Sequence, residues 1–310
     1  MRVRVPFAVL LVLLAASSLV GCTRGSKAKA APSPSAGFPA TIQAANGAVL
    51  LPAKPVRIVS LSPTLTEDLY AMGAGSQVIA VDNDSNYPAG VPSTNLSGFT
   101  PNLEAIAGYR PDLVLASDDL KGLVAGMKGL GISILLEPAA KTLDDTYAEI
   151  TQIGVATGHA PEATTLVQGI KTKVQALSGK VAHRSKPLTY YYELDQTLYT
   201  ATSHTFGGSL FNLVGLQNVA DKVDNGSGYP QLSPEALLAA NPDFIFLADS
   251  KCCGQNATTV AARPGYATIT AVQKGRIVAL DDDVASRWGP RVTDLLGRIV
   301  DAVNAVPAGG

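Results

Sequence analysis

The sequence predicts an α/β protein of two similar lobes, each with a parallel-type sheet, joined by a single long helix with a cleft between the lobes. Three observations predict this class. Short apolar runs alternate with helix-like stretches after residue 40, which is typical of parallel sheets covered on both faces. A diverged internal repeat indicates two copies of one α/β unit. An amphipathic stretch between the copies indicates the helix that joins them.

Residues 1–21 have the composition of a secretory signal peptide. Arg2 and Arg4 precede an apolar run over residues 5–20, and a small residue stands just before Cys22. A membrane-spanning helix is the alternative. It is disfavoured because the uncharged stretch is at the short limit for a bilayer and a processing site follows at once.

The end of this segment, Leu-Val-Gly-Cys, resembles the lipobox of bacterial lipoproteins, in which the cysteine becomes the lipidated N-terminus. Residues 22–39 are rich in Lys, Ala, Ser, Pro and Gly, so they bury little apolar surface and predict a flexible tether. We therefore expect the folded part to lie outside the cytoplasm, held at a membrane by the lipid on Cys22.

The remaining cysteines, Cys252 and Cys253, are adjacent. In an oxidising compartment their only partners are each other or another molecule. We expect a vicinal disulfide that shapes a loop. A soft-metal site is the alternative, although further ligands are missing nearby.

The first lobe is predicted over residues 40–160. Two short apolar runs surround Asn46-Gly47 within residues 41–51, which predicts a β-hairpin. Ser62-Pro63 offers an N-cap and a first-turn proline for a helix that ends near Gly73. Strands are expected at Val56–Ser60, Gln77–Val81, Asp112–Ala116 and Ile132–Leu136.

The internal repeat pairs two segments that share one order of features: an aromatic loop, a short helix with one Glu near its start, a Pro-Asp turn and a buried strand. The segments are residues 97–118 and 227–249. Glu104 and Glu235 are 131 positions apart, and so are the two Pro-Asp turns. The aromatic pair, Phe99 and Tyr229, is displaced by one residue. Helix–turn–strand connections of this kind are common, but the matched positions favour a true repeat.

Residues 161–180 are predicted to form the interlobe helix, because apolar side chains recur with the spacing of one helix face. These are Ala163, Val167, Ile170, Val174 and Leu177. Gly169 costs this helix about 1 kcal/mol relative to Ala. The second lobe is predicted over residues 181–310, with strands that include 188–193 and 276–280.

In parallel α/β sheets, ligands bind beyond the carboxyl ends of the strands, and two facing lobes form one cleft from both sets of loops. The loops expected there hold many of the aromatic residues: Tyr87, Phe99, Tyr199, Tyr229 and Trp288. Local packing explains any one of them, but convergence of all five would suit a large flat or apolar ligand. Tyr190, Tyr191 and Tyr192 lie within a predicted strand and are expected in the core and on the sheet surface.

Asp283 and Arg287 follow the strand at 276–280 and could offer hydrogen bonds to the polar edges of a ligand. Asp283 could instead cap the N-terminus of a helix. A metal site at residues 281–283 is not expected, because consecutive side chains point in different directions and no His or Glu lies nearby.

The composition argues against nucleic-acid binding and catalysis. With 24 Lys and Arg against 25 Asp and Glu, the chain lacks the basic surface that phosphate backbones require. The three histidines are scattered, and the sequence holds no nucleophile elbow, P-loop or dinucleotide fingerprint. We therefore expect a binding protein without a cofactor. The alternative class is a lipid-anchored extracytoplasmic enzyme or assembly factor on the same scaffold.

The lipobox, residues 57–63, the repeated Glu helices, the joining helix and residues 286–291 together resemble the solute-binding lipoproteins of ABC importers for cobalamin, ferric siderophores and haem. The resemblance covers nearly everything after Ala40. It implies a monomer that captures a metal chelate and delivers it to an ABC permease and its ATPase. It also implies that the lobes close on ligand by a small tilt.

The resemblance implies roles for two sets of residues. Glu104 and Glu235 match the positions that dock onto basic residues of the two permease subunits, whereas the simpler alternative is a first-turn glutamate favoured by the helix dipole. The positions that match the lining of a corrinoid pocket are Tyr87, Phe99, Tyr199, Tyr229, Asp283 and Arg287. Arg287 and Arg291 are available for the anionic groups of a siderophore. A corrinoid is the favoured ligand, ahead of a ferric siderophore and then haem.

Overall fold

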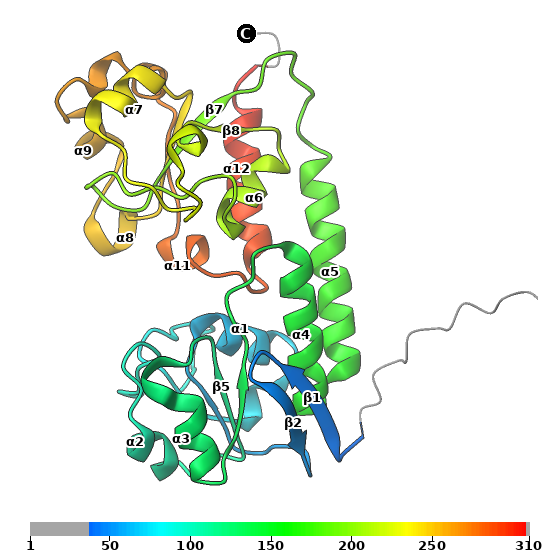
Figure 1. Ribbon diagram of the computed structural model, residues 1–310. Coiled ribbons are helices and arrows are strands. Elements are labelled where there is room, and N and C mark those ends of the chain that lie inside the picture. The colour runs from blue at the N-terminus through cyan, green and yellow to red at the C-terminus, as the bar shows by residue number, and fades with distance from the viewer. Residues whose placement is uncertain (1–36, 308–310) are drawn as a thin grey trace, which may run out of the picture. The chain divides into compact units, whose positions relative to one another are not determined.

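The computed structural model describes residues 37–307 (Figure 1). The predicted signal peptide, Cys22 and nearly all of the predicted tether lie outside the described residues. Across residues 37–307, every helix falls short of the length or the apolar character that crossing a bilayer requires.

The first sheet has four parallel strands in the order β4-β3-β5-β6. Its strands are almost entirely buried because the sheet is covered on both faces. The strands are β3 (Ile58–Ser60), β4 (Val78–Val81), β5 (Leu113–Ala116) and β6 (Ser133–Leu136). The helices of this region are α1 (Pro63–Ala71), α2 (Leu103–Gly108), α3 (Leu123–Gly129) and α4 (Leu143–Thr157), with short 3₁₀ turns at Ala74–Gln77 and Leu120–Gly122.

The predicted hairpin is confirmed as the antiparallel pair β1 (Ala40–Ala44) and β2 (Gly47–Leu51). Gly47 has a φ of 97°, which a residue with a side chain rarely adopts. The amide side chain of Asn46 bonds the backbone of β6 in both directions, to Ile134 O at 3.0 Å and from Leu136 N at 3.1 Å. This turn therefore also attaches the hairpin to the first sheet.

The second sheet is also parallel, in the order β8-β7-β9-β10. Its strands are β7 (Thr189–Glu193), β8 (Gln217–Asn218), β9 (Phe244–Leu247) and β10 (Ile277–Ala279). The helices that accompany it are α6 (Phe206–Asn212), α7 (Pro234–Ala240), α8 (Ser250–Cys253), α9 (Ala257–Ala261), α10 (Thr270–Gln273), α11 (Asp282–Ala285) and α12 (Val292–Asn304), with 3₁₀ turns at Asp221–Val223 and Tyr266–Thr268. The prediction of two α/β units with parallel sheets is confirmed.

The internal repeat is visible in the hydrogen bonds. Asp112 accepts from the backbone N–H of Arg57 at 3.0 Å, and Asp243 accepts from that of Thr189 at 2.9 Å. Each Pro-Asp turn is thereby tied to the start of the neighbouring strand, β3 or β7. The helices before these turns also begin alike, with side-chain caps from Asn102 in α2 and Ser233 in α7.

The chain passes from the first sheet to the second once, through α4 and α5 (Ala160–Ser178). The helix predicted at 161–180 corresponds to α5. It packs against α4 on one side and against α12 on another (Figure 1). Beyond it, Tyr190, Tyr191 and Tyr192 are buried in β7, and the Tyr190 ring stacks on Phe211 with centroids 4.2 Å apart.

Two buried carboxyl groups meet between α1 and α4. Asp68 is fully buried, and no N–H or hydroxyl group of the described residues donates to its oxygens. Burial and the neighbouring charge of Glu149 raise the pKa of Asp68 well above its usual value. Burial likewise raises the pKa of Glu149 to about 8. Burial and the proximity of the other acid therefore favour the protonated form of each carboxyl group.

This pair predicts a fall in the free energy of unfolding between about pH 5 and pH 8. In that window the unfolded carboxyls lose their protons while the folded ones keep them, so the folded state binds more protons and rising pH favours unfolding. The substitution Glu149→Gln should reduce the fall, with a gain on the order of 1 kcal/mol at pH 8. Urea unfolding across this range measures it. The exposed Glu162→Gln is the control, and an unaltered slope in Glu149→Gln would contradict a raised pKa of Glu149.

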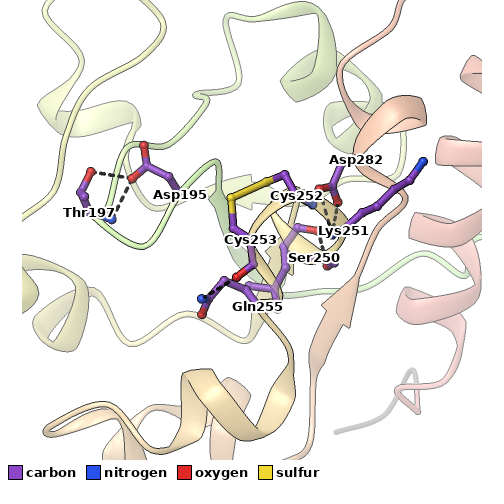
Figure 2. Close-up of a disulfide and its surroundings, with 9 residues drawn as sticks. Asp195, Thr197, Ser250, Lys251, Cys252, Cys253, Gln255 and Asp282 are labelled. Carbon is purple, nitrogen blue, oxygen red and sulfur yellow. Dashed lines mark hydrogen bonds between the residues drawn. A yellow bond between two sulfur atoms is a disulfide. The ribbon is translucent and has the colours of Figure 1, made fainter. Parts of the chain in front are cut away.

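Figure 2 shows the disulfide that joins Cys252 and Cys253 at the end of α8. Asp282 accepts hydrogen bonds from the backbone N–H groups of Lys251 and Cys252, at 2.9 and 2.7 Å. Gly254 then ends the helix with a φ of 69°. The disulfide therefore lies in a loop at the carboxyl edge of the second sheet, attached to the start of α11.

We expect the double substitution Cys252→Ser, Cys253→Ser to lower the free energy of unfolding by only about 1 kcal/mol. The bond closes a loop of two residues, and the chain-entropy contribution of a disulfide grows with the length of the loop. Urea unfolding of the variant measures this, with the wild-type chain under dithiol reductant as the matched comparison. A loss of several kcal/mol would show that the disulfide organises the lobe as a whole.

Candidate ligand-binding site

A cavity of about 490 Å³ lies at the carboxyl ends of the first sheet. Leu61, Asp82 and residues 116–118 contribute the ends of β3, β4 and β5, and the opposite lining comes from the segment that begins at Asp283 in α11. The cavity thus occupies the position at which open parallel sheets bind ligands, and both α/β units contribute to it.

The guanidinium of Arg287 lines this cavity but is already paired. Its Nη1 lies 2.7 Å from Glu67 Oε1, and its Nη2 donates to Asp283 Oδ1 and to the backbone oxygen of Asp84, both at 3.1 Å. Glu67, only 2% exposed, also accepts from Arg291 Nε at 2.8 Å. The buried Glu67 carboxylate therefore pairs with both guanidinium groups, which the sequence had predicted to be available for the anionic groups of a siderophore.

Trp288 lies in the same segment and is held from two sides. Its Nε1 donates to Glu149 Oε1 at 3.1 Å, and its backbone oxygen accepts from the Thr146 hydroxyl at 2.8 Å. The next residue, Gly289, approaches α1 so closely that a Cβ there would lie 3.1 Å from Thr64 Cγ2. These contacts with α1 and α4 fix the indole in the cavity wall.

Asp283 links several parts of the wall. It accepts hydrogen bonds from Asn86 Nδ2 at 3.0 Å and from Lys251 Nζ. Burial alone would raise its pKa, but the hydrogen bonds from Lys251 and Asn86 outweigh burial and lower it. The N-cap of α11 is Asp281, whose side chain accepts from Val284 N at 3.1 Å, so the alternative role of Asp283 as a cap is corrected.

The lining carries an excess of carboxyl groups. They are Asp82, Asp84, Asp118 and Asp283, against the single guanidinium of Arg287. Burial raises the pKa of Asp82 to about 6, so this group is still ionised at neutral pH. Despite these acids, residues 37–307 contain no cluster of three or more His, Cys, Asp or Glu side chains suited to a metal ion.

The structure separates the predicted ligand-binding residues into three places. Those that line the cavity are Phe99, Asp283, Arg287 and Trp288. Tyr87 and Arg291 line a different hollow of about 360 Å³, where the guanidinium lies 4.2 Å from the ring centroid. Tyr199 and Tyr229 are exposed and do not belong to the cavity lining. Of the predicted aromatic side chains, the cavity therefore receives Phe99 and Trp288.

Asp82, Asp84 and Asp118 line the cavity but were not among the predicted site residues. Asp82 comes directly after the strand predicted at 77–81, and Asp118 comes two residues after the strand predicted at 112–116. Since ligands bind at the carboxyl ends of parallel strands, these positions carried a usable signal.

Glu104 and Glu235 are both exposed, each in the first turn of its short helix. They occupy equivalent places in α2 and α7, since each is the second residue after the N-cap of its helix. Their side chains make no hydrogen bond or ion pair with any residue in the range 37–307. Both carboxylates are therefore available to a partner.

Comparison with known proteins gives three agreeing results. The family model described as periplasmic binding protein matches residues 58–284. An uncharacterized ABC transporter substrate-binding lipoprotein of Bacillus subtilis, YvrC, is 31% identical over 94% of this chain and 95% of its own. A cobalamin-binding protein of Halobacterium salinarum is 29% identical over 86% of this chain and 74% of its own.

Solved structures show the same likeness. A possible iron-binding protein of Staphylococcus epidermidis aligns with a TM-score of 0.71 and 28% identity, covering 81% of this chain and 99% of its own. The vitamin B12 binding protein BtuF of Vibrio cholerae aligns with a TM-score of 0.69 and 26% identity, covering 81% and 98%. The chain therefore belongs to the periplasmic binding protein family, and it is a solute-binding component of an ABC importer, not an enzyme.

Proposed function

We propose that this protein captures a metal chelate outside the cytoplasm and delivers it to an ABC permease and its ATPase, with a cobalamin-like corrinoid as the favoured ligand. The observation that carries the choice of ligand is the charge of the cavity lining. Its carboxyl groups outnumber its cations, and the guanidinium of Arg287 is taken by Glu67 and Asp283. A neutral ligand with peripheral carboxamides suits such a lining better than an anionic one.

The aromatic part of the lining supports the same class of ligand. Phe99 is 71% exposed, and Trp288, which is fixed against α1 and α4, lines the same cavity. Flat rings in the lining suit the face of a macrocycle. Haem has a similar face but carries propionates, and many ferric siderophores are anionic. We therefore place a ferric siderophore second and haem third.

We propose that the protein acts as a monomer tethered by lipid on Cys22, with residues 22–39 as the flexible link. The lipobox supports this, as does the description of the Bacillus subtilis relative as a lipoprotein. We also propose that α5 is the element joining the lobes 40–160 and 181–310. A helix packed between α4 and α12 is stiff, which favours closure by a small tilt.

We propose that Glu104 and Glu235 dock the loaded protein onto basic residues of the two permease subunits. Both are exposed and lie at equivalent positions of the repeat, so they offer a pseudo-twofold pair of carboxylates. Such a pair complements a transporter with two similar subunits.

Thermal melting tests the ligand. At a ligand concentration 100 times Kd, binding should add about 2.7 kcal/mol to the stability of the folded state and raise Tm by several degrees. We expect this shift with cyanocobalamin, and a smaller or absent shift with ferric siderophores and haem. Phe99→Ala should reduce the shift without lowering the Tm of the free protein. If no chelate produces a shift, the proposed class of ligand is wrong.

Charge reversal tests docking. The double variant Glu104→Lys, Glu235→Lys should abolish uptake in cells that carry the permease while leaving the Kd of the soluble ligand complex within twofold of wild type. Glu162→Lys makes the same charge change at an exposed first-turn position of α5 and serves as the matched control. Normal uptake by the double variant, or loss of ligand binding, would contradict the docking role.

A further inference from the structure

Asp82 is the most buried of the cavity aspartates, with 2% of its surface exposed. Its backbone N–H donates to Ser60 O at 2.9 Å, which fixes it at the end of β4. Its Oδ1 accepts from the Ser85 hydroxyl, but no N–H or O–H group in residues 37–307 donates to Oδ2. Oδ2 is not among the fully buried polar atoms that lack a partner within residues 37–307, so this oxygen is accessible from the cavity. A ligand that displaces water here must offer a donor to Oδ2, because a carboxylate oxygen that is desolvated without a donor is unfavourable.

The surroundings of Asp82 provide no free cation. Arg287, the only cationic residue in the lining, is committed to Glu67 and Asp283. A second polar group of the lining, the Ser117 hydroxyl, is buried and has no hydrogen-bond partner in the described part of the chain. The lining residues therefore include the Asp82 carboxylate, whose Oδ2 has no donor within residues 37–307, and the unpartnered hydroxyl of Ser117.

Asp82 also lies close to the aromatic wall. A Cβ on Gly98 would come 2.4 Å from Leu61 O and 3.5 Å from Asp82 Oδ2. Only glycine permits this approach, and the following residue is Phe99. Phe99 and Asp82 Oδ2 therefore flank one part of the cavity, so that a ring stacked on Phe99 would bring its peripheral groups to the carboxylate.

We propose that Asp82 contacts the ligand directly and determines its class, by accepting a hydrogen bond from a peripheral N–H or O–H donor such as a carboxamide and repelling a carboxylate at the same place. This inference rests on the proposed function, because it states which chelates that cavity selects. It differs from the roles of Asp283 and Arg287, whose polar atoms are bound to neighbouring side chains.

The test compares chelates that differ only in these peripheral groups. One set is cyanocobalamin and its monocarboxylates, in each of which one propionamide is replaced by propionate. The second is haem and the haem derivative whose two propionates are primary amides. Kd is measured by tryptophan fluorescence or calorimetry on the full chain. For wild type we expect at least one carboxylate form to bind about tenfold or more weakly than its amide counterpart.

The variant Asp82→Asn keeps an oxygen that can accept from Ser85, removes the charge and adds an N–H donor. It should bind the amide ligand about tenfold more weakly and bind the disfavoured carboxylate form more tightly than wild type does. Asp301→Asn is the control: it removes the same charge from an exposed residue of α12 that does not line the cavity, and it should change each Kd by less than threefold.

The outcomes separate the inference from the function on which it rests. Discrimination in wild type that Asp82→Asn removes and Asp301→Asn retains supports the inference, whichever chelate binds. If the ligands bind but amide and carboxylate forms bind alike, the inference is overturned while the proposed function stands. A folded Asp82→Asn that discriminates as wild type does would overturn the inference in the same way. If no chelate of either set binds wild type but a ferric siderophore raises its Tm, the inference and the choice of a corrinoid are overturned while capture of a chelate stands. If no chelate of any class binds, the proposed function is overturned as well.

Discussion

The pairing of Glu67 with Arg287 and Arg291 is the interaction on which the cavity wall depends. Glu67 lies on the buried face of α1, so its charge is stable only with cations beside it. Both cations come from a segment more than 200 residues later, which is thereby drawn onto α1. Replacing Glu67, or the arginines that pair with it, would leave a buried charge uncompensated and lower the free energy of unfolding by about 3–5 kcal/mol. The wall that carries Asp283 and Trp288 is placed by this pairing.

Buried acids in this protein are stabilised in two different ways, and both occur in each α/β unit. In the first unit Glu67 is paired with guanidinium groups, while burial raises the pKa values of Asp68 and Glu149 and so favours their protonated forms. In the second, Arg263 binds Glu193 with both terminal nitrogens, at 2.7 and 2.6 Å. Nearby Asp249 has no cation of its own, and burial together with the charge of Glu193 raises its pKa to about 7.

The sequence predicts the fold well because the signals for it are local. The hairpin at 41–51 depends on Asn46-Gly47, and α5 depends on one periodic apolar face; both signals lie within a few residues of the structure they specify. The disulfide was predictable because Cys252 and Cys253 are adjacent and no other pairing is available in the folded part.

The cavity was harder to predict, because its composition depends on contacts between distant segments. From the sequence alone, Arg287 and Arg291 are predicted to be available to a ligand. Their ion pairs with Glu67 could not be predicted, because Glu67 lies more than 200 residues earlier and no local pattern links it to them. Tyr87 likewise reads as a ligand-binding aromatic, but Arg291 stacks on its ring in a separate hollow. By contrast, Asp82 could have been identified by applying the strand-end rule to every predicted strand.

The two copies of the repeat differ at the positions near the cavity, where the proposed role is ligand binding. They remain alike at the helices proposed to dock onto the permease. Asp118 and Asp249 are equivalent by position, yet Asp118 is exposed in the cavity lining while Asp249 is buried among the side chains of its own unit. The strand ends of the first unit line the cavity, and those of the second contribute mainly the segment after β10. Because the proposed chelate lacks twofold symmetry, its binding does not require the two units to contribute equally to the cavity lining. Docking onto two similar subunits does require equivalence, and the capped helices with Glu104 and Glu235 have retained it.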